Sequence, residues 1–413
     1  MFSVMLSPVT NTEISEPFDA VSTIISEWAT DLLGISHAIH ADPELSFEEH
    51  NACELLASKA EQAGFDVTRG AFGLKTSFSA TRGDGPFRVV ICAEYDALPE
   101  VGHACGHNVI AASALGAAVA LAEVASEYGL SVVLLGTPAE EHGAGKTVLL
   151  ERGAWESATM SIMAHGYGGH DIGCAQISSR GVDRFDVTFT GRASHAAAAP
   201  QLGVNAGDAA TLSLVAIGLL RQQLSSDICM NAYVELGGEA TNIIPARTLV
   251  RAEVRGFALA DLLDAKRRML ACFEGAAIAT GCEWKTERSE PLYAELVQCP
   301  TLARQWDEEL RQLGRTIVTE ATLVIGSTDM GNVSQVVPTI HPIIAFRGKS
   351  SATHTIEFAE DSVSEAADEA VIHAAIAMAR TVIAVASGDS RQELLTLAAD
   401  RAPGSTRVPL TSE

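Results

Sequence analysis

Side chains that bind metal ions follow four short apolar segments of this sequence, each shortly after the segment ends. The segments cover residues 88–93, 131–136, 159–164 and 339–346, and their composition predicts β-strands. The side chains that follow are, in chain order, Cys105 and His107, the pair Glu140 and Glu141, His165, and His354. Thiolate, imidazole and carboxylate groups are the ligands of zinc and of neighbouring divalent metals. The sequence therefore predicts a metal site beyond the ends of these strands.

The adjacent carboxylates Glu140 and Glu141 indicate what such a site could do. One of them can bind an ion, while the other stays free to take a proton from water and later to donate it to a leaving nitrogen. Five candidate ligands that include a bridging-capable thiolate favour two ions, which in two-metal sites lie about 3.5–4 Å apart. Metal binding lowers the pKa of water from 15.7 towards about 7 and polarises a carbonyl. These residues predict a metal-dependent hydrolase of an amide or an ester.

Each of these residues also has an ordinary structural interpretation. A single cysteine is most often a small buried hydrophobe, and two adjacent glutamates are most often on the surface. Cys105 differs because it lies between His103 and His107 in the Gly-punctuated segment GHACGH, and the Glu140–Glu141 pair directly follows an apolar strand. Two other functions stay open. A cysteine-nucleophile hydrolase using Cys105 leaves the carboxylate pair unexplained, and a metal-binding protein without turnover has no use for a free base.

Composition excludes several classes of protein. The 413 residues contain 28 Lys+Arg against 52 Asp+Glu, a net charge of −24, which disfavours nucleic acid as a partner. The longest apolar stretch, residues 109–122, is too short to span a bilayer. The N-terminal sequence lacks a basic region followed by a sustained apolar run, so we expect no secretion signal. Eight cysteines without a CxxC pair favour a reducing, cytoplasmic location.

The order of predicted elements indicates an α/β catalytic domain with a second domain inserted into it. Apolar strands that alternate with helices predict a mostly parallel sheet covered by helices on both faces. The middle of the chain predicts the order βαββαβ, a ferredoxin-like α+β unit. The predicted domains are residues 1–183 (catalytic, first part), 184–293 (inserted), 294–390 (catalytic, second part) and 391–413 (a peripheral, mobile tail).

Several longer segments of the sequence, which include these residues, resemble those of a known family. They are HADPELSFEEH, AEYDALPEVGHACGHN, PAEEHGAGK, GRASHAAAAPQLGVNA, GGEATNIIPA and GSTDMGNVSQVVPTIHP. Together they resemble the M20 metallopeptidases, most closely the amidohydrolase branch of aminoacylases, p-aminobenzoyl-glutamate hydrolase and Xaa-Arg dipeptidase. The resemblance runs from about His37 to Ser387 and implies an exopeptidase-type catalytic domain with an inserted lid that also forms a homodimer. It implies cleavage of a small N-acyl amino acid or dipeptide.

The resemblance also assigns roles to single positions. It implies a two-ion site whose ligands are Cys105, His107, Glu141, His165 and His354. The ions would be Zn²⁺ or Mn²⁺, and Co²⁺ and Ni²⁺ accept the same ligands. Glu140 matches the general acid/base, Asp96 an acidic position beside the metals, and His195 a residue that stabilises the oxyanion from the partner subunit. The substrate-binding positions implied are Asn242, Arg255, Asp329 and Arg347.

Overall fold

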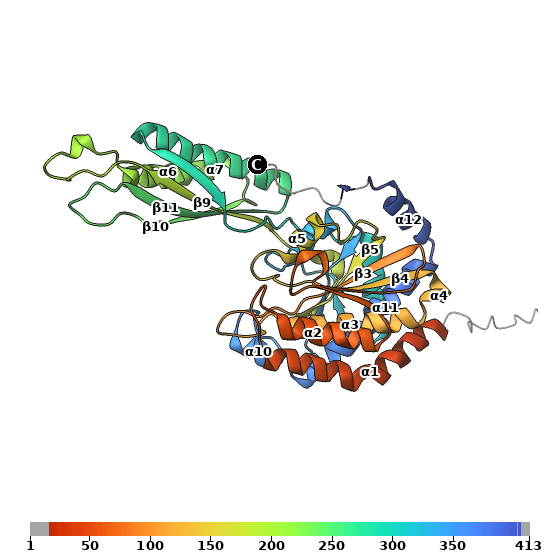
Figure 1. The fold of residues 1–413 in the computed structure, drawn as a ribbon. Helices are drawn as coiled ribbons and strands as arrows, with labels where there is room; N and C mark the ends of the chain where they lie inside the picture. Colours follow the sequence, from red (N-terminus) through yellow and green to blue (C-terminus); the bar gives the residue numbers. More distant parts are fainter. Residues whose placement is uncertain (1–15, 403, 406–413) are drawn as a thin grey trace, which may run out of the picture.

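The computed structural model describes residues 16–402 and 404–405. The expectation that the N-terminus carries no secretion signal concerns mainly residues 1–15, which lie outside the described residues. Residues 403 and 406–413 of the predicted tail also lie outside them. Figure 1 shows two parts: a larger part built around a sheet, and a smaller part that projects from it.

A six-stranded sheet forms the centre of the larger part, in the order β1-β2-β4-β3-β5-β15. Its strands are β1 (Asp66–Arg69), β2 (Phe78–Arg82), β3 (Phe87–Ala93), β4 (Leu130–Gly136), β5 (Met160–Ile162) and β15 (Thr339–Ile340). The neighbours β4, β3, β5 and β15 run parallel, whereas β2 is antiparallel to both β4 and β1. The predicted α/β class is confirmed, with a sheet that is mixed because of β1 and β2.

The register of the parallel strands brings their carboxyl ends to one edge of the sheet. Ala93 at the end of β3 pairs with Gly136 at the end of β4, and Ile162 at the end of β5 pairs with Ile340 at the end of β15. The segments that leave these strands therefore start side by side, where open α/β sheets place their ligand sites. Short parallel pairs lie beyond the edge: β6 (His165–Tyr167) with β16 (Ile343–Ala345), β7 (Asp171–Ile172) with β13 (Ile317–Val318), and β8 (Ile177–Ser178) with β14 (Leu323–Val324).

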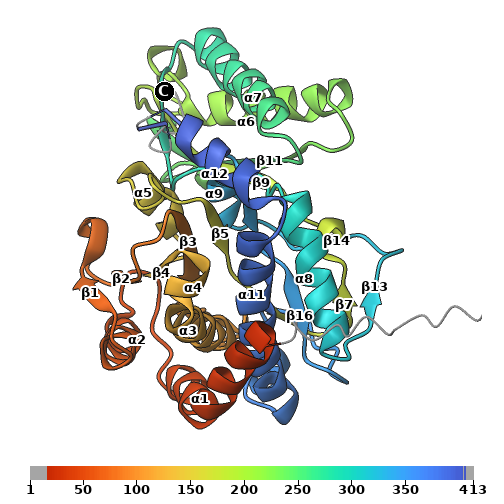
Figure 2. The ribbon, with the colours of Figure 1, turned by 90° about the vertical axis from the view of Figure 1, so that its right-hand side faces the viewer.

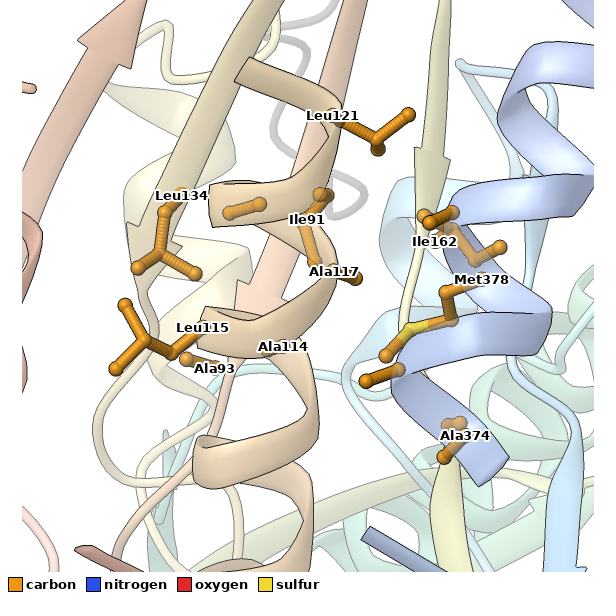
Figure 3. Packing of buried hydrophobic residues seen from close by; sticks show 14 of the residues in the cluster. Ile91, Ala93, Ala114, Leu115, Ala117, Leu121, Leu134, Ile162, Ala374 and Met378 are labelled. Atoms are coloured by element: carbon orange, nitrogen blue, oxygen red, sulfur yellow. The ribbon is translucent and has the colours of Figure 1, made fainter. Parts of the chain in front are cut away.

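Helices cover both faces of the sheet because its parallel strands present apolar residues to both sides. The helices of the larger part are α1 (Glu16–Ala41), α2 (His50–Gln62), α3 (His107–Glu123), α4 (Ala125–Tyr128), α5 (Gly145–Glu151), α8 (Pro300–Gln312), α9 (Met330–Ser334), α10 (Ile356–Asp361), α11 (Glu365–Ser387) and α12 (Arg391–Asp400). Ile91 of β3 belongs to a cluster with residues of α1, α3 and α11 on one face, and Figure 3 shows the residues of α3 and α11 in it. Val90 packs with α5 and α9 on the other face.

Helix α3 passes through the middle of the core, and all of residues 107–122 are buried. Its small side chains let neighbouring helices approach closely: a Cβ added at Gly116 would lie 2.7 Å from Leu32 Cδ1 of α1. This packing holds the first residue of α3, His107, against the carboxyl edge of the sheet.

One helix of the described part of the chain, α11, is long and apolar enough to cross a membrane by length and composition. However, 72% of its apolar window is buried against the rest of the protein. Its neighbours are α1, α3 and α8. This is the environment of a core helix.

The projecting part contains a second sheet, in the order β10-β11-β9-β12, with all neighbours antiparallel. Its elements are β9 (Gly181–Thr190), α6 (Ala206–Leu220), β10 (Cys229–Leu236), β11 (Arg247–Gly256), α7 (Leu259–Thr280) and β12 (Glu283–Arg288). Helices α6 and α7 pack on one face of this sheet through a core of their own. The order βαββαβ is the one that the sequence predicts, and we keep residues 184–293 as the proposed extent of an inserted domain.

The single strand predicted over residues 339–346 is interrupted in the structure. Pro342 has no backbone N–H to donate to a neighbouring strand, and the N–H of His341 donates to the Gln298 side chain, at 2.9 Å. The segment therefore forms two short strands, β15 and β16, with a kink between them.

The predicted tail begins with a helix that packs on the larger part. Figure 2 shows α12 directly beyond the end of α11. Leu394 is buried, Arg391 donates a hydrogen bond to the carbonyl of Tyr128 at 3.0 Å, and its guanidinium lies 5.4 Å from the centre of the Phe87 ring. The expectation of a mobile tail is therefore corrected for residues 391–400.

This packing predicts that Leu394→Ala lowers the free energy of unfolding by about 2–5 kcal/mol, because it leaves a cavity between α12 and the core. Leu397→Ala is the control on the same helix, since Leu397 is 51% exposed and should cost less than about 0.5 kcal/mol. Denaturant unfolding of the full chain measures both. Similar small losses for the two variants would mean that α12 does not contribute to the folded core.

Candidate active site

The carboxyl edge of the sheet positions all six predicted metal ligands and base residues. Cys105 and His107 lie at the end of the segment after β3, where Gly106 takes a left-handed conformation and α3 begins. Glu140 and Glu141 follow β4, and His165 begins β6. His354 lies in the segment after β16, and its N–H donates to the carbonyl of Ala104 at 2.8 Å, which fixes it beside Cys105.

The ligand atoms converge around the thiol of Cys105. Its Sγ lies 3.7 Å from His165 Nε2 and 3.6 Å from His354 Nε2. Two groups share this sulfur, each with ligand atoms within 4.8 Å of one another: Cys105 with His107 and His165, and Cys105 with Glu141 and His354. This arrangement places a thiol between two half-sites that each hold two further ligands.

Unpartnered buried atoms show that this group fits a metal. His107 Nε2 and Glu141 Oε1 are buried, and neither has a hydrogen-bond partner. The other ring nitrogens are used: His107 Nδ1 contacts Asp96 Oδ1 at 3.0 Å, and His165 Nδ1 contacts the carbonyl of Gly166 at 2.6 Å. Metal-binding histidines have this pattern, because a bond at one ring nitrogen orients the other towards the ion.

Electrostatics also favour a cation at this point. Burial lowers the pKa of His107, but Asp96 and Glu94 raise it well above its usual value. The surroundings of its ring therefore stabilise positive charge, which a divalent ion can supply in place of a proton. Burial, followed by the charge of His107, lowers the pKa of His165 to about 4 and keeps that imidazole neutral. Burial and Glu141 raise the pKa of the Cys105 thiol, the opposite of what an activated cysteine nucleophile needs.

Glu140 lies beside the ligands and faces the cavity. Its Oε2 is 3.9 Å from His107 Nε2, and its side chain is largely buried. Burial, then the charges of Glu94 and Glu141, raises the pKa of Glu140 well above its usual value. A carboxyl group with a raised pKa can both accept and return a proton near neutral pH.

Asp96 lies behind the ligands and orients them. Its Oδ1 contacts His107 Nδ1, and its Oδ2 accepts hydrogen bonds from the backbone N–H of Glu141 at 3.0 Å and from Ser46 Oγ at 2.9 Å. Burial raises the pKa of Asp96, but the charge and hydrogen bond of His107 outweigh burial and lower it to about 2. Asp96 is therefore an ionised group that joins two predicted ligands.

A cavity of about 670 Å³ opens over this group. Its walls include Arg184 and Arg255 of the projecting part and residues 323–328 of the larger part. Arg255 donates to Glu253 at 3.0 Å and to Ser327 Oγ at 3.4 Å, so it already spans the two parts. This volume is that of a small-molecule site.

Comparison with known proteins decides the family. The model of peptidase family M20/M25/M40 matches residues 90–384, more than half of the chain. This chain belongs to that family. It is 36% identical to the Xaa-Arg dipeptidase of Mus musculus over 378 residues, 87% of each chain. It is 30% identical to one of the subunits of the p-aminobenzoyl-glutamate hydrolase of Escherichia coli (strain K12) over 268 residues, 60% of this chain and 55% of that protein.

The fold is similar to that of the Bacillus subtilis YXEP protein, a dinuclear metal binding peptidase from the M20 family. The TM-score is 0.66 and the identity 22%, and the match covers 87% of this chain and 99% of that protein.

Asp329 and Arg347, two of the four substrate-binding positions implied for this M20 family chain, do not line the cavity. Asp329 is fully buried and pairs with Lys146, and Arg347 contacts Glu369 at 3.1 Å and the carbonyl of Gly314 at 3.0 Å. Their positions support structural roles, because each charged group already has a protein partner.

His195 and Asn242 lie together in the projecting part, far from the cavity of their own chain. Both are exposed, and the backbones of His195 and Ile243 pair as an isolated bridge. His195 lies beyond Thr190, the last residue of β9, and Arg184 lies near the other end of this strand. The strand from Arg184 to Thr190, at about 3.3 Å per residue, spans about 20 Å. His195 Nδ1 accepts hydrogen bonds from two backbone N–H groups, at 3.1 and 3.2 Å. In the neutral ring Nε2 therefore carries the proton and can donate it.

Sequence reasoning missed a buried ion cluster behind the site. Lys146 Nζ lies 2.6 Å from Asp329 Oδ1 and also contacts Glu94, and all three side chains are buried. Glu94 Oε2 is in turn 3.5 Å from His107 Nε2. Burial alone would lower the pKa of Lys146, but Asp329 and Glu94 raise it, so the lysine stays charged. The available signal was a glutamate directly after an apolar strand, but nothing in the sequence shows that Lys146 folds back onto it.

Replacing Lys146 by methionine should lower the free energy of unfolding by about 3–5 kcal/mol, because two buried carboxylates lose their counter-charge. Lys285→Met is the matched control: Lys285 forms an exposed pair with Glu287, and its loss should cost about 1 kcal/mol or less. Both variants are unfolded in denaturant after chelator treatment, so that metal content does not enter the comparison. A loss for Lys146→Met as small as that for the control would contradict its counter-charge role.

Proposed function

We propose that this protein is a metal-dependent amidohydrolase that cleaves the amide bond of a small N-acyl amino acid or dipeptide. The observation that carries the proposal is the convergence of four further ligand side chains on Cys105, with Glu140 beside them under a cavity of suitable size. The similarity to an Xaa-Arg dipeptidase and to a p-aminobenzoyl-glutamate hydrolase supports this substrate class.

We propose that two divalent ions occupy the two groups that share Cys105, as in the dinuclear M20 peptidase of Bacillus subtilis. Zn²⁺ or Mn²⁺ fits this mixed ligand set, and Co²⁺ and Ni²⁺ are accepted by it. Ions bound there would supply Lewis-acid polarisation of the scissile carbonyl and a lowered water pKa.

The protein's own residues divide the remaining work. Glu140 takes a proton from the attacking water and returns it to the leaving nitrogen. Asp96 holds His107 and the backbone of Glu141 in place. Arg255 faces the cavity and is the proposed contact for the substrate within the same chain.

We further propose a homodimer formed through the projecting part. Strand β10 lies at the edge of its sheet, with β11 as its neighbour. Beside it, Leu212, Val215 and Leu219 form an exposed apolar stripe on α6. An unpaired edge next to an apolar helix face favours association with a second copy. Such a dimer would let His195 and Asn242 reach the partner's cavity.

All eight cysteines are free, which supports the proposed cytoplasmic location.

The main test measures released amine from a panel of N-acyl amino acids and dipeptides, including an Xaa-Arg dipeptide and p-aminobenzoyl-glutamate, on metal-loaded protein. Glu140→Gln should lower kcat by about 10²–10⁴, because it removes the proton acceptor while the ligands remain. Glu141→Gln should instead lower the metal content measured by elemental analysis.

Three outcomes would contradict these assignments. Activity that survives exhaustive chelation would favour the cysteine nucleophile, since a thiol enzyme needs no metal. Full metal occupancy without turnover on any panel member would favour a binding protein. Normal rates and metal contents in both glutamate variants would remove the roles given to this pair.

Complementation between subunits tests the proposed role of His195. Loss of a donor to the developing oxyanion should lower kcat by about 10²–10³ in His195→Ala. Mixing this variant with Glu140→Gln, under conditions that exchange subunits, should return activity towards half of wild type per heterodimer, because one of its two sites is intact. If verified exchange restores no activity, His195 does not act in the partner's site.

A further inference from the structure

Tyr293 lies where the chain returns from the projecting part to the larger part, and it is buried. Its backbone N–H and C=O are bonded to those of Val182, at 3.0 and 2.8 Å. Val182 is the second residue of β9, by which the chain enters the projecting part. The two connections between the parts therefore form one short pair of strands at Tyr293.

The Tyr293 hydroxyl is bonded to both ends of the segment that carries the glutamate pair. It donates to the carbonyl of Glu140 at 3.0 Å and accepts from the N–H of Ala144 at 3.1 Å. Its ring packs against Ala144 and Val182 in a small apolar cluster of their own. One side chain thus joins the connection between the parts to the backbone of the proposed base.

Glu290 makes a second link of the same kind. Its Oε1 forms an ion pair with Arg184 of β9, and its Oε2 accepts from the N–H of Gly143 at 3.4 Å. The returning connection is therefore bonded to residues 140–144 through two side chains, and β9 is bonded to this connection through Val182 and Arg184.

The backbone of this segment depends on its surroundings. Ala139 has φ 61° and Ala144 has φ 50°, left-handed conformations that are unfavourable for residues with a Cβ and persist only where neighbours hold them. Glu49 Oε1 accepts from the N–H of Ala139 at 2.8 Å, and Tyr293 holds the N–H of Ala144. The two strained positions bracket Glu140, and one of them is held from the connection between the parts.

We propose that Tyr293 is a positioning residue that ties the backbone of Glu140 to the strand pair connecting the two parts. A rotation of the projecting part about this strand pair moves Tyr293, and with it the carbonyl of Glu140 and the N–H of Ala144. The proposal rests on the proposed function of Glu140 as the base.

Tyr293→Phe tests it, because the ring and its packing stay while both hydrogen bonds are lost. We expect kcat on the best panel substrate to fall about ten-fold, with KM within two-fold and metal content unchanged, since two hydrogen bonds to the base segment disappear. Hydrogen–deuterium exchange, followed by mass spectrometry, should also speed up in peptides that cover residues 139–146. Tyr128→Phe is the control: its hydroxyl contacts Glu127 at the surface, and neither kcat nor exchange of residues 139–146 should change.

A second variant tests whether the links act together. Glu290→Gln weakens the contact to Gly143 and should also lower kcat. In the double variant of Tyr293→Phe and Glu290→Gln, the fold-decrease in kcat should be smaller than the product of the two single-variant decreases, because both links hold one segment. Independent, multiplicative effects would overturn the joint role.

Other results separate this inference from the proposed function. If wild type is active and Tyr293→Phe is destabilised but keeps normal kcat and normal exchange of residues 139–146, Tyr293 is only structural and the inference fails. If wild type and all variants cleave no panel substrate, the proposed function fails, and the exchange measurement still decides whether Tyr293 holds the segment.

Discussion

Buried negative charge at the carboxyl edge of the sheet is the constraint to which the rest of this structure responds. Glu94, Asp96, Glu140 and Asp329 are buried there, and Glu141 adjoins them. Carboxylates in the interior must be paired or must share their charge with a cation, because the interior solvates ions poorly. The basic groups in direct contact with this cluster are Lys146 and the imidazoles of His107 and His354. Five acids against one lysine and two imidazoles leave an excess of negative charge, which divalent ions would balance.

Some groups in this cluster hold neighbouring side chains in place, whereas others keep an atom without a hydrogen-bond partner. Lys146 holds Glu94 and Asp329 together, and Asp96 fixes both His107 and the backbone of Glu141. What remains without a hydrogen-bond partner includes His107 Nε2 and Glu141 Oε1, and these atoms belong to the two groups around Cys105. In His107 and His165, supporting contacts thus use one ring nitrogen and leave the other for an ion.

The two ends of the projecting part have different relations to the cavity. Its near end supplies Arg184 and Arg255 to the cavity and is bonded to the base segment through Tyr293 and Glu290. His195 lies at its far end, beyond β9, whose residues from Arg184 to Thr190 span about 20 Å. The length of this strand keeps His195 away from the cavity of its own chain, which is why we propose that it acts through a second subunit, while the returning connection stays within reach of Glu140.

The sequence by itself determined the α/β class, the elements of the projecting part and the segments after the strands that carry the six ligand and base residues. These follow from local patterns: apolar runs predict strands, and parallel strands bring their carboxyl ends together. Only the tertiary structure decided which charged residues pair with one another. Asp329 and Arg347 matched motifs, yet they are bound to partners 183 and 22 residues away, and Lys146 of α5 packs against Glu94, which follows β3. It also decided that residues 391–400 pack as a helix and that Tyr293 reaches Glu140. Such contacts join segments distant in the chain, and pairing across that distance depends on how whole elements pack, which local residue patterns do not encode.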